Sequence, residues 1–194
     1  MANIITLSRI FMIFIVAALL FWGTQVSMIS ALVLTGFVMW FDGLDGYVAR
    51  KFNETSKLGA VLDIMGDRIV ENVFWVTFCA LGWINVAIPI IVLTRGIVTD
   101  SLRSLALAQG FTAFGEKTMM QGKIAKFIVA SNFSRFTYAV CKAVAFVFLI
   151  AGHLGLGTDH SLYTIGLICT YISVAFCVLR GLPVIIESKR FFEE

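Results

Sequence analysis

The chain has 194 residues, of which 59% are hydrophobic and 14% are charged, and its mean hydropathy is +0.93. This composition excludes an ordinary soluble domain and indicates an integral membrane protein. The net charge of +3 is too small to indicate nucleic acid binding, and the length suits one membrane domain, residues 1–194, without a second sizeable domain.

Six apolar runs follow one another along the chain, and each is long enough to cross the hydrocarbon core of a bilayer. We expect an all-α integral membrane protein with six transmembrane helices. Their approximate bounds are Ile5–Trp22, Val26–Tyr47, Leu58–Gly82, Ile84–Leu107, Phe127–Ala151 and Leu162–Ile186. The first run lacks the basic start and the small-residue cleavage site of a signal peptide, so we expect it to be retained.

Basic residues gather on alternate sides of these runs. They lie near the start, in the second-to-third and fourth-to-fifth connections, and in the tail: Arg9, Arg50, Lys51, Lys57, Lys117, Lys123, Lys126, Lys189 and Arg190. The other three connections contain neither Lys nor Arg. The positive-inside rule therefore predicts that both termini face the cytoplasm, in the cytoplasmic (inner) membrane.

Four aspartates flank the second-to-third connection. Asp42 and Asp45 are three residues apart, and Asp63 and Asp67 are four apart, so each pair lies on one face of a helix. The residues between the pairs are largely polar and indicate a connection between two helices. If these helices form an antiparallel hairpin, all four carboxylates converge near its mouth, on the cytoplasmic side.

In such a cluster either some carboxyl groups stay protonated or cations neutralise them, because two like charges 4 Å apart repel by about 4 kcal/mol at an effective dielectric of about 20. Carboxylate oxygens without His or Cys select hard cations such as Mg²⁺, Mn²⁺ or Ca²⁺. Two divalent cations would balance four carboxylates, and such pairs clamp phosphates during displacement reactions. The alternative is that these aspartates are helix caps and solvated surface charges.

Further charged residues fall inside or at the ends of the apolar runs: Arg68, Glu71, Arg95, Asp100, Arg103, Arg135, Lys142 and Arg180. Intramembrane ionisable residues are functional candidates, because lipid does not accommodate them free. They can also pair with each other, as Asp100 with Arg103 one helical turn on. As a group beside a metal site, they suit a doubly charged phosphate substrate.

The stretch from Asp42 to Asp67 resembles the signature of the CDP-alcohol phosphatidyltransferases, integral membrane enzymes of phospholipid synthesis. All eight fixed positions are present: Asp42, Asp45, Gly46, Ala49, Arg50, Gly59, Asp63 and Asp67. The resemblance implies that a CDP-linked lipid donates its phosphatidyl group to an alcohol, with release of CMP. It also implies that the four aspartates hold two divalent cations, Mg²⁺ or Mn²⁺, and that Asp67 is the general base.

The same resemblance assigns the CDP moiety to the other signature positions. Gly46 and Gly59 would let the nucleotide approach the backbone, although both glycines also suit tight helix packing. Arg50 can hold a phosphate in a forked geometry. Thr55 and Ser56 are candidates to bind the cytidine or its ribose. Thr6 stands in an opening pattern, Asn3-x2-Thr6-x2-Arg9, that is similar to the start of family members.

The acceptor is expected to be a phosphorylated alcohol bound by basic residues: Arg95, Arg103, Lys123, Lys126 and Arg180. The fourth run and the Gly122-Lys123-x2-Lys126 cluster resemble the phosphatidylglycerophosphate synthase branch, whose acceptor is glycerol 3-phosphate. Asp67-Arg68 instead resembles the branch that uses inositol phosphate. A homodimer is implied by the family alone. Two other functions stay open: an intramembrane prenyltransferase, and a divalent-cation carrier with the aspartates as its ion path.

Overall fold

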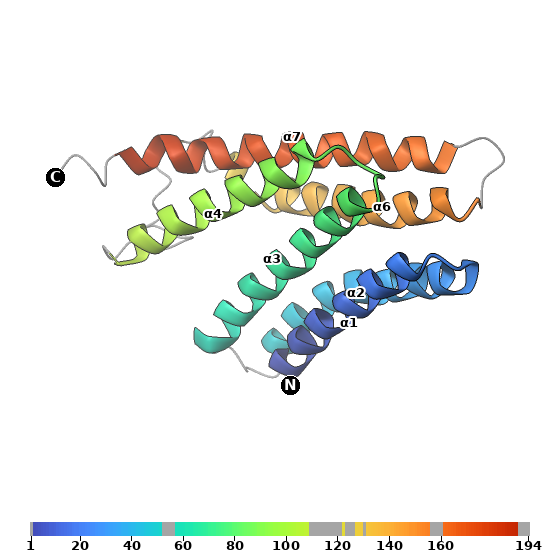
Figure 1. Ribbon diagram of the computed structural model, residues 1–194. Coiled ribbons are helices and arrows are strands. Elements are labelled where there is room, and N and C mark those ends of the chain that lie inside the picture. Colours follow the sequence, from blue (N-terminus) through green and yellow to red (C-terminus); the bar gives the residue numbers. More distant parts are fainter. Residues whose placement is uncertain are drawn as a thin grey trace. The chain divides into compact units, whose positions relative to one another are not determined.

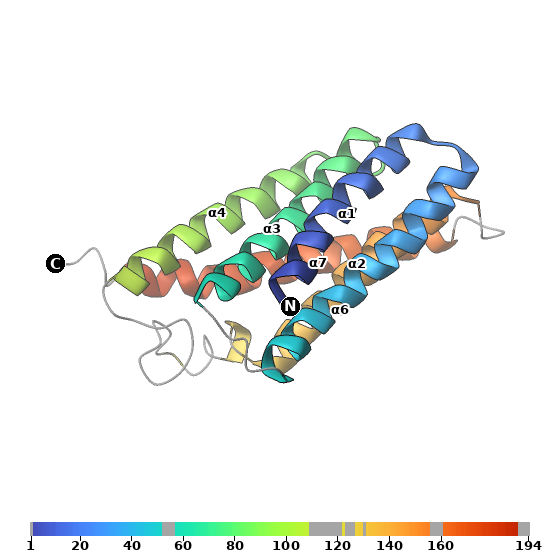
Figure 2. The ribbon, with the colours of Figure 1, turned by 90° about the horizontal axis from the view of Figure 1, so that it is seen from below.

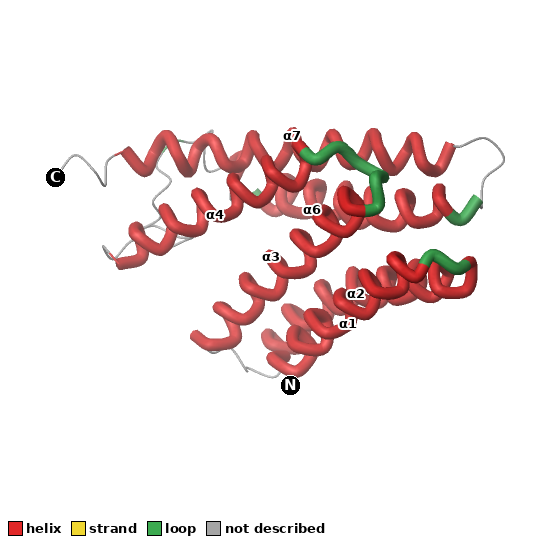
Figure 3. The backbone as a smooth tube through the Cα atoms, in the orientation of Figure 1, coloured by secondary structure: helices red, strands yellow, loops and turns green. Residues whose placement is uncertain are grey.

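The computed structural model describes residues 2–51, 57–108, 122, 127–129, 131–155 and 161–189; the side chains of 2, 43–51, 57, 58, 60 and 132 are not among those described. The described residues form helices and short connections, and none of them forms a strand (Figure 3). The helices are α1 (Ala2–Trp22), α2 (Gln25–Lys51), α3 (Lys57–Ala80), α4 (Ala87–Ala108), α6 (Asn132–His153) and α7 (Ser161–Ser188). Each expected apolar run corresponds to one of these helices, which confirms the all-α prediction.

Apolar helices make this a membrane protein. Four helical segments of the described chain are long and apolar enough to cross a bilayer: Asn3–Trp22, Gln25–Asp42, Phe127–His153 and Ser161–Ser188. The remaining two helices, α3 and α4, have 24 and 22 residues, so length does not prevent them from spanning. Each of them contains more charged side chains than any of those four segments. Six spans therefore stay a prediction. The assignment of residues 1–194 to a single domain also stays a prediction.

The chain divides into two compact units, the first comprising Met1–Val86 and Ala143–Ile168. In this unit α1 packs against both α2 and α3, as Figures 1 and 2 show from two sides. A two-residue connection joins α1 to α2, and its Gly23 has a φ of +68°, which favours glycine. Oγ1 of Thr24 accepts a hydrogen bond from the backbone N–H of Ser27 at 3.2 Å and so caps α2. This short, capped connection makes α1 and α2 antiparallel neighbours.

An aromatic cluster joins α3 to the last part of α6 within the same unit. The ring of Phe146 stacks on Phe74 at a centroid distance of 4.3 Å and meets the edge of Trp75 at 4.7 Å. All three rings are fully buried, and Phe78 extends the cluster by one helical turn of α3. Large rings at i and i+4 on one helix face form such a seam, so the cluster fixes α3 in this unit.

The second unit comprises Ala87–Lys142 and Cys169–Glu194, that is, α4 with the first part of α6 and the last part of α7. The helix α4 begins two residues before Pro89, where the missing N–H costs no helical hydrogen bond. Gly181 of α7 lies against the side chain of Arg95 of α4: a Cβ at Gly181 would approach Cγ of Arg95 to 2.9 Å. The absence of a side chain at Gly181 therefore makes room for a charged residue inside the unit.

Candidate active site

The aspartate pairs lie on consecutive helices of the first unit, as expected. The first pair lies toward the end of α2, which continues to Lys51, and the second lies near the start of α3, which begins at Lys57. The positions of Asp42 and Asp45, and of Asp63 and Asp67, are one turn apart along helical backbone. The polar connection between the two helices lies outside the described residues.

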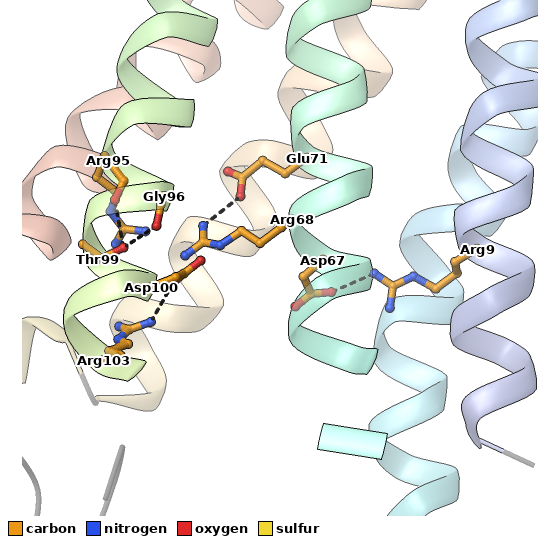
Figure 4. A network of polar contacts seen from close by, with 9 residues as sticks. All are labelled: Arg9, Asp67, Arg68, Glu71, Arg95, Gly96, Thr99, Asp100 and Arg103. Atoms are coloured by element: carbon orange, nitrogen blue, oxygen red, sulfur yellow. Dashed lines mark hydrogen bonds and ion pairs between the residues drawn. The ribbon is translucent and has the colours of Figure 1, made fainter. Parts of the chain in front are cut away.

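Arg9 of α1 brings two of these carboxylates together. Its Nη2 donates to Oδ1 of Asp67 at 2.8 Å, and the same nitrogen forms an ion pair with Oδ1 of Asp42 (Figure 4 shows the contact with Asp67). Because one nitrogen contacts both oxygens, the carboxylates of Asp42 and Asp67 must face each other across α2 and α3. The predicted convergence is confirmed for these two side chains.

Burial differs sharply across this contact. The side chain of Arg9 is 1% exposed, whereas those of Asp42 and Asp67 are 43% and 50% exposed. The arginine therefore approaches from inside the bundle, and a large part of each carboxylate stays accessible. Accessible carboxylate oxygens facing each other are the donor set that hard divalent cations prefer, so these residues fit a metal site of the predicted kind.

The structure describes only some of the other predicted ligands. Asp63 is exposed on α3, one turn before Asp67. The side chains of Asp45, Gly46, Ala49 and Arg50 are not among those described, although their backbone belongs to α2. Thr55 and Ser56 lie outside the described residues. Within the described part of the chain, no three His, Cys, Asp or Glu side chains come together as a metal site.

Thr6 of α1, a predicted nucleotide ligand, is 3% exposed and lies against α3. A Cβ at Gly66 would come within 2.7 Å of Cγ2 of Thr6, so α1 and α3 approach closely beside Asp67. This contact gives Thr6 a packing role, and its nucleotide-binding role stays a prediction. Gly59, the other described nucleotide candidate, is half-buried near the start of α3.

The importance of Arg9 and Gly66 was not predicted from the sequence. There, Arg9 is a positive charge beside the first apolar run and the end of a short opening pattern. The available signal was the spacing of Thr6 and Arg9, two polar residues one turn apart on a largely apolar helix. Their shared face is the one that α3 covers at Gly66 and Asp67.

Arg68 follows Asp67 on α3 and forms an ion pair with Glu71, Nη1 to Oε2 at 3.6 Å (Figure 4). Glu71 is 4% exposed, so its charge requires a partner of this kind. Arg68 is thus engaged by an acid on its own helix, one turn on. The sequence singled out both residues as intramembrane charges without pairing them.

The second unit contains the described part of the predicted acceptor site. Arg103 pairs with Asp100 on α4 at 3.7 Å, which confirms the predicted one-turn pair (Figure 4). Arg95 lies on the same helix, where its carbonyl accepts a hydrogen bond from the Thr99 hydroxyl at 2.9 Å. The Nε–H of Arg95 is buried and has no hydrogen-bond partner among the described residues. Lys123 and Lys126 lie outside them.

Arg180 of α7 has a structural task that the sequence did not indicate. Its two terminal nitrogens donate to the backbone carbonyls of Ser134 and Val129, each at 3.2 Å. Its guanidinium carbon also lies 5.5 Å from the centre of the Tyr138 ring. Arg95 and Arg103 lie near enough for their charges to act on Arg180. The described acids of this unit are Asp100, which pairs with Arg103, and Glu187, which accepts a hydrogen bond from the backbone N–H of Gly122.

The fold and the site define a helical membrane protein with facing aspartates on two consecutive helices. The chain belongs to the CDP-alcohol phosphatidyltransferase family, because residues 1–179 match that family. This confirms the resemblance seen in the Asp42–Asp67 stretch.

Individual relatives agree with this assignment. The chain is 31% identical over 165 residues to the CDP-diacylglycerol–glycerol-3-phosphate 3-phosphatidyltransferase of Pseudomonas fluorescens, covering 79% of this chain and 83% of the relative. It is 30% identical to the protein of the same name from Aquifex aeolicus, over 49% of this chain and 53% of the relative. It is also 32% identical to the phosphatidylinositol phosphate synthase of Mycobacteroides abscessus, over 48% and 51% respectively.

Proposed function

We propose that this protein transfers a phosphatidyl group from CDP-diacylglycerol to the hydroxyl of a phosphorylated alcohol, most simply glycerol 3-phosphate. The acceptor oxygen forms a bond to the phosphorus that bears the diacylglycerol, the bond from that phosphorus to CMP breaks, and CMP leaves. The observation that carries the proposal is that the carboxylates of Asp42 and Asp67 meet at Arg9. Both aspartates belong to a stretch that has all eight positions of the family signature.

Asp67 is assigned the role of general base. It is half exposed, so an acceptor hydroxyl can reach it and pass its proton to the carboxylate. Asp42, Asp45, Asp63 and Asp67 would hold two divalent cations, Mg²⁺ or Mn²⁺, which neutralise the donor's diphosphate and polarise its phosphoryl oxygens. Gly46, Ala49, Arg50, Thr55, Ser56, Gly59 and Thr6 remain the proposed contacts of the CDP moiety.

The acceptor's phosphate is assigned to the arginines of the second unit, with Lys123 and Lys126. The buried Nε–H of Arg95, without a partner among the described residues, supports an anion there, because buried donors are normally paired. The relatives from Pseudomonas fluorescens and Aquifex aeolicus are both named for glycerol 3-phosphate as acceptor, which favours that substrate. A relative named phosphatidylinositol phosphate synthase supports inositol phosphate as the second candidate. Both acceptors carry a phosphate.

The proposed setting is the cytoplasmic membrane, with six spans, both termini and the aspartates on the cytoplasmic side, and a homodimeric assembly. The distribution of Lys and Arg among the connections supports the orientation. The dimer rests on the family alone.

The direct experiment supplies purified protein with CDP-diacylglycerol, Mg²⁺ or Mn²⁺, and a panel of acceptors. The panel contains glycerol 3-phosphate, inositol phosphate, glycerol and inositol, and the lipid product is identified by mass. We expect CMP release and a new lipid only with a phosphorylated acceptor. If no phosphorylated polyol in the panel supports CMP release, the proposed function is wrong; if the free alcohols serve equally well, the acceptor assignment is wrong.

A further inference from the structure

The guanidinium of Arg9 is positioned as a fixed counter-charge between Asp42 and Asp67. It comes from α1, whereas the eight signature positions lie on α2 and α3. A single nitrogen, Nη2, contacts one oxygen of each carboxylate. The arginine thus ties three helices together at the point where two predicted metal ligands meet.

The geometry separates an inner and an outer side of this pair of carboxylates. Arg9 is almost fully buried and occupies the inner side, while about half of each aspartate side chain remains exposed on the outer side. Two carboxylates this close repel strongly unless a cation lies between them. In this protein the guanidinium of Arg9 is such a cation.

We propose that Arg9 is a positioning residue that holds Asp42 and Asp67 together before any divalent cation arrives. The inference rests on the proposed function in one respect only, since it takes these aspartates to be metal ligands. Arg9 offsets their repulsion from the buried side, so the separation of α2 and α3 at the site is set by the protein itself. A divalent cation that binds these two carboxylates from the outer side then takes over part of this neutralisation.

An ordinary structural ion pair would also stabilise the protein, but the destabilisation caused by removing it would be the same with and without a divalent cation. If Arg9 instead offsets repulsion between two ligands, a divalent cation can replace part of what Arg9 supplies. Removing Arg9 should therefore lower the stability of the metal-free protein more than that of the metal-bound protein. This difference requires no assay of activity.

The first test measures thermal unfolding of purified protein in EDTA and in Mg²⁺ for wild type, Arg9→Gln, Arg9→Lys and Arg68→Gln. In EDTA we expect the Tm of Arg9→Gln to fall by about 6 °C or more, since breaking a buried pair is costly. Mg²⁺ should restore much of the loss, so that the metal-induced rise in Tm exceeds that of wild type. Arg9→Lys, which keeps the charge on a shorter arm, should lie between them.

Arg68→Gln is the matched control, because it removes the same charge from the residue next to Asp67. Arg68 forms an ion pair with Glu71. The metal-induced rise in Tm of Arg68→Gln should equal that of wild type. If Arg9→Gln does not fold, Arg9→Lys carries the test, and its metal-induced rise must exceed that of wild type. An equal rise in wild type and in the Arg9 variant overturns the proposal.

A double variant gives an independent result in EDTA alone. Asp67→Asn should lower the Tm in the wild-type background, where it removes a partner of Arg9, and raise it in the Arg9→Gln background, where it removes the repulsion. A fall in both backgrounds contradicts the proposal. These results stand apart from the proposed function: absence of CMP release by wild type would reject the enzyme, whereas the two unfolding experiments would still decide the role of Arg9.

Discussion

Gly66 on α3 lies directly against Thr6 on α1, so closely that a Cβ on the glycine would come within 2.7 Å of the threonine methyl group. The next residue on α3 is Asp67, and one turn beyond Thr6 on α1 is Arg9. The close approach of the two helices therefore sets the distance at which Arg9 reaches the carboxylates. Helix packing and site geometry are fixed at the same place.

Gly66→Ala should accordingly damage catalysis without altering any charged residue. The added methyl forces α1 and α3 apart, and misplacement of Asp67 by about 1 Å can cost roughly 100-fold in rate. Steady-state CMP release measures the loss. Gly36→Ala on α2 is the control, because a Cβ there meets no atom within 4 Å. Equal activity of the two variants would contradict the role assigned to this crossing.

Gly181→Ala should weaken binding of the acceptor and leave binding of the donor largely unaffected. The new methyl would lie 2.9 Å from Cγ and 3.1 Å from Nε of Arg95, so that side chain must move. We expect the KM for the acceptor to rise about tenfold, a change equivalent to roughly 1.4 kcal/mol. KM values for both substrates provide the measurement. A parallel rise in the KM for CDP-diacylglycerol would assign Arg95 to the donor instead.

Arg180→Lys should lower stability although it keeps the positive charge. Lysine cannot reproduce the two hydrogen bonds to the carbonyls of Ser134 and Val129, and leaving buried acceptors unpaired costs about 1–3 kcal/mol each. Thermal unfolding should show a reduced Tm. Arg135→Lys, an exposed arginine on α6, is the comparison and should leave the Tm close to that of wild type. Identical Tm values for the two variants would remove the structural role of Arg180.

Phe146→Ala should be among the most destabilising single changes. The ring is 1% exposed and packs against Phe74, Trp75 and Phe78, and truncation of such a core ring typically costs about 3–5 kcal/mol. Phe136→Ala, on the same helix but 70% exposed, should cost far less. Comparable loss of Tm in both would indicate that the aromatic cluster does not anchor α3.

Helices and ion pairs within one helix could be predicted from the sequence, whereas contacts between residues far apart in the chain could not. Apolar run lengths predicted each helix to within a few residues, and one-turn spacing predicted the Asp100–Arg103 pair. The pairing of Arg9 with Asp42 and Asp67 could not be predicted, because it joins residues far apart in the chain and depends on how three helices pack. The same is true of Arg180, whose partners are backbone carbonyls of another helix and of the segment before it. Four helical segments are apolar and long enough to span a bilayer, whereas α3 and α4 contain more charged side chains than any of those segments.

Asp67 is the residue on which the proposed reaction depends most. The most direct test measures CMP release from CDP-diacylglycerol by wild type and by Asp67→Asn, with donor binding determined in parallel. The substitution keeps the shape of the side chain and removes its proton-accepting charge. We expect turnover to fall by a factor of about 100 to 10,000, the usual contribution of a general base, with donor binding largely intact. Unchanged turnover would contradict the role of Asp67.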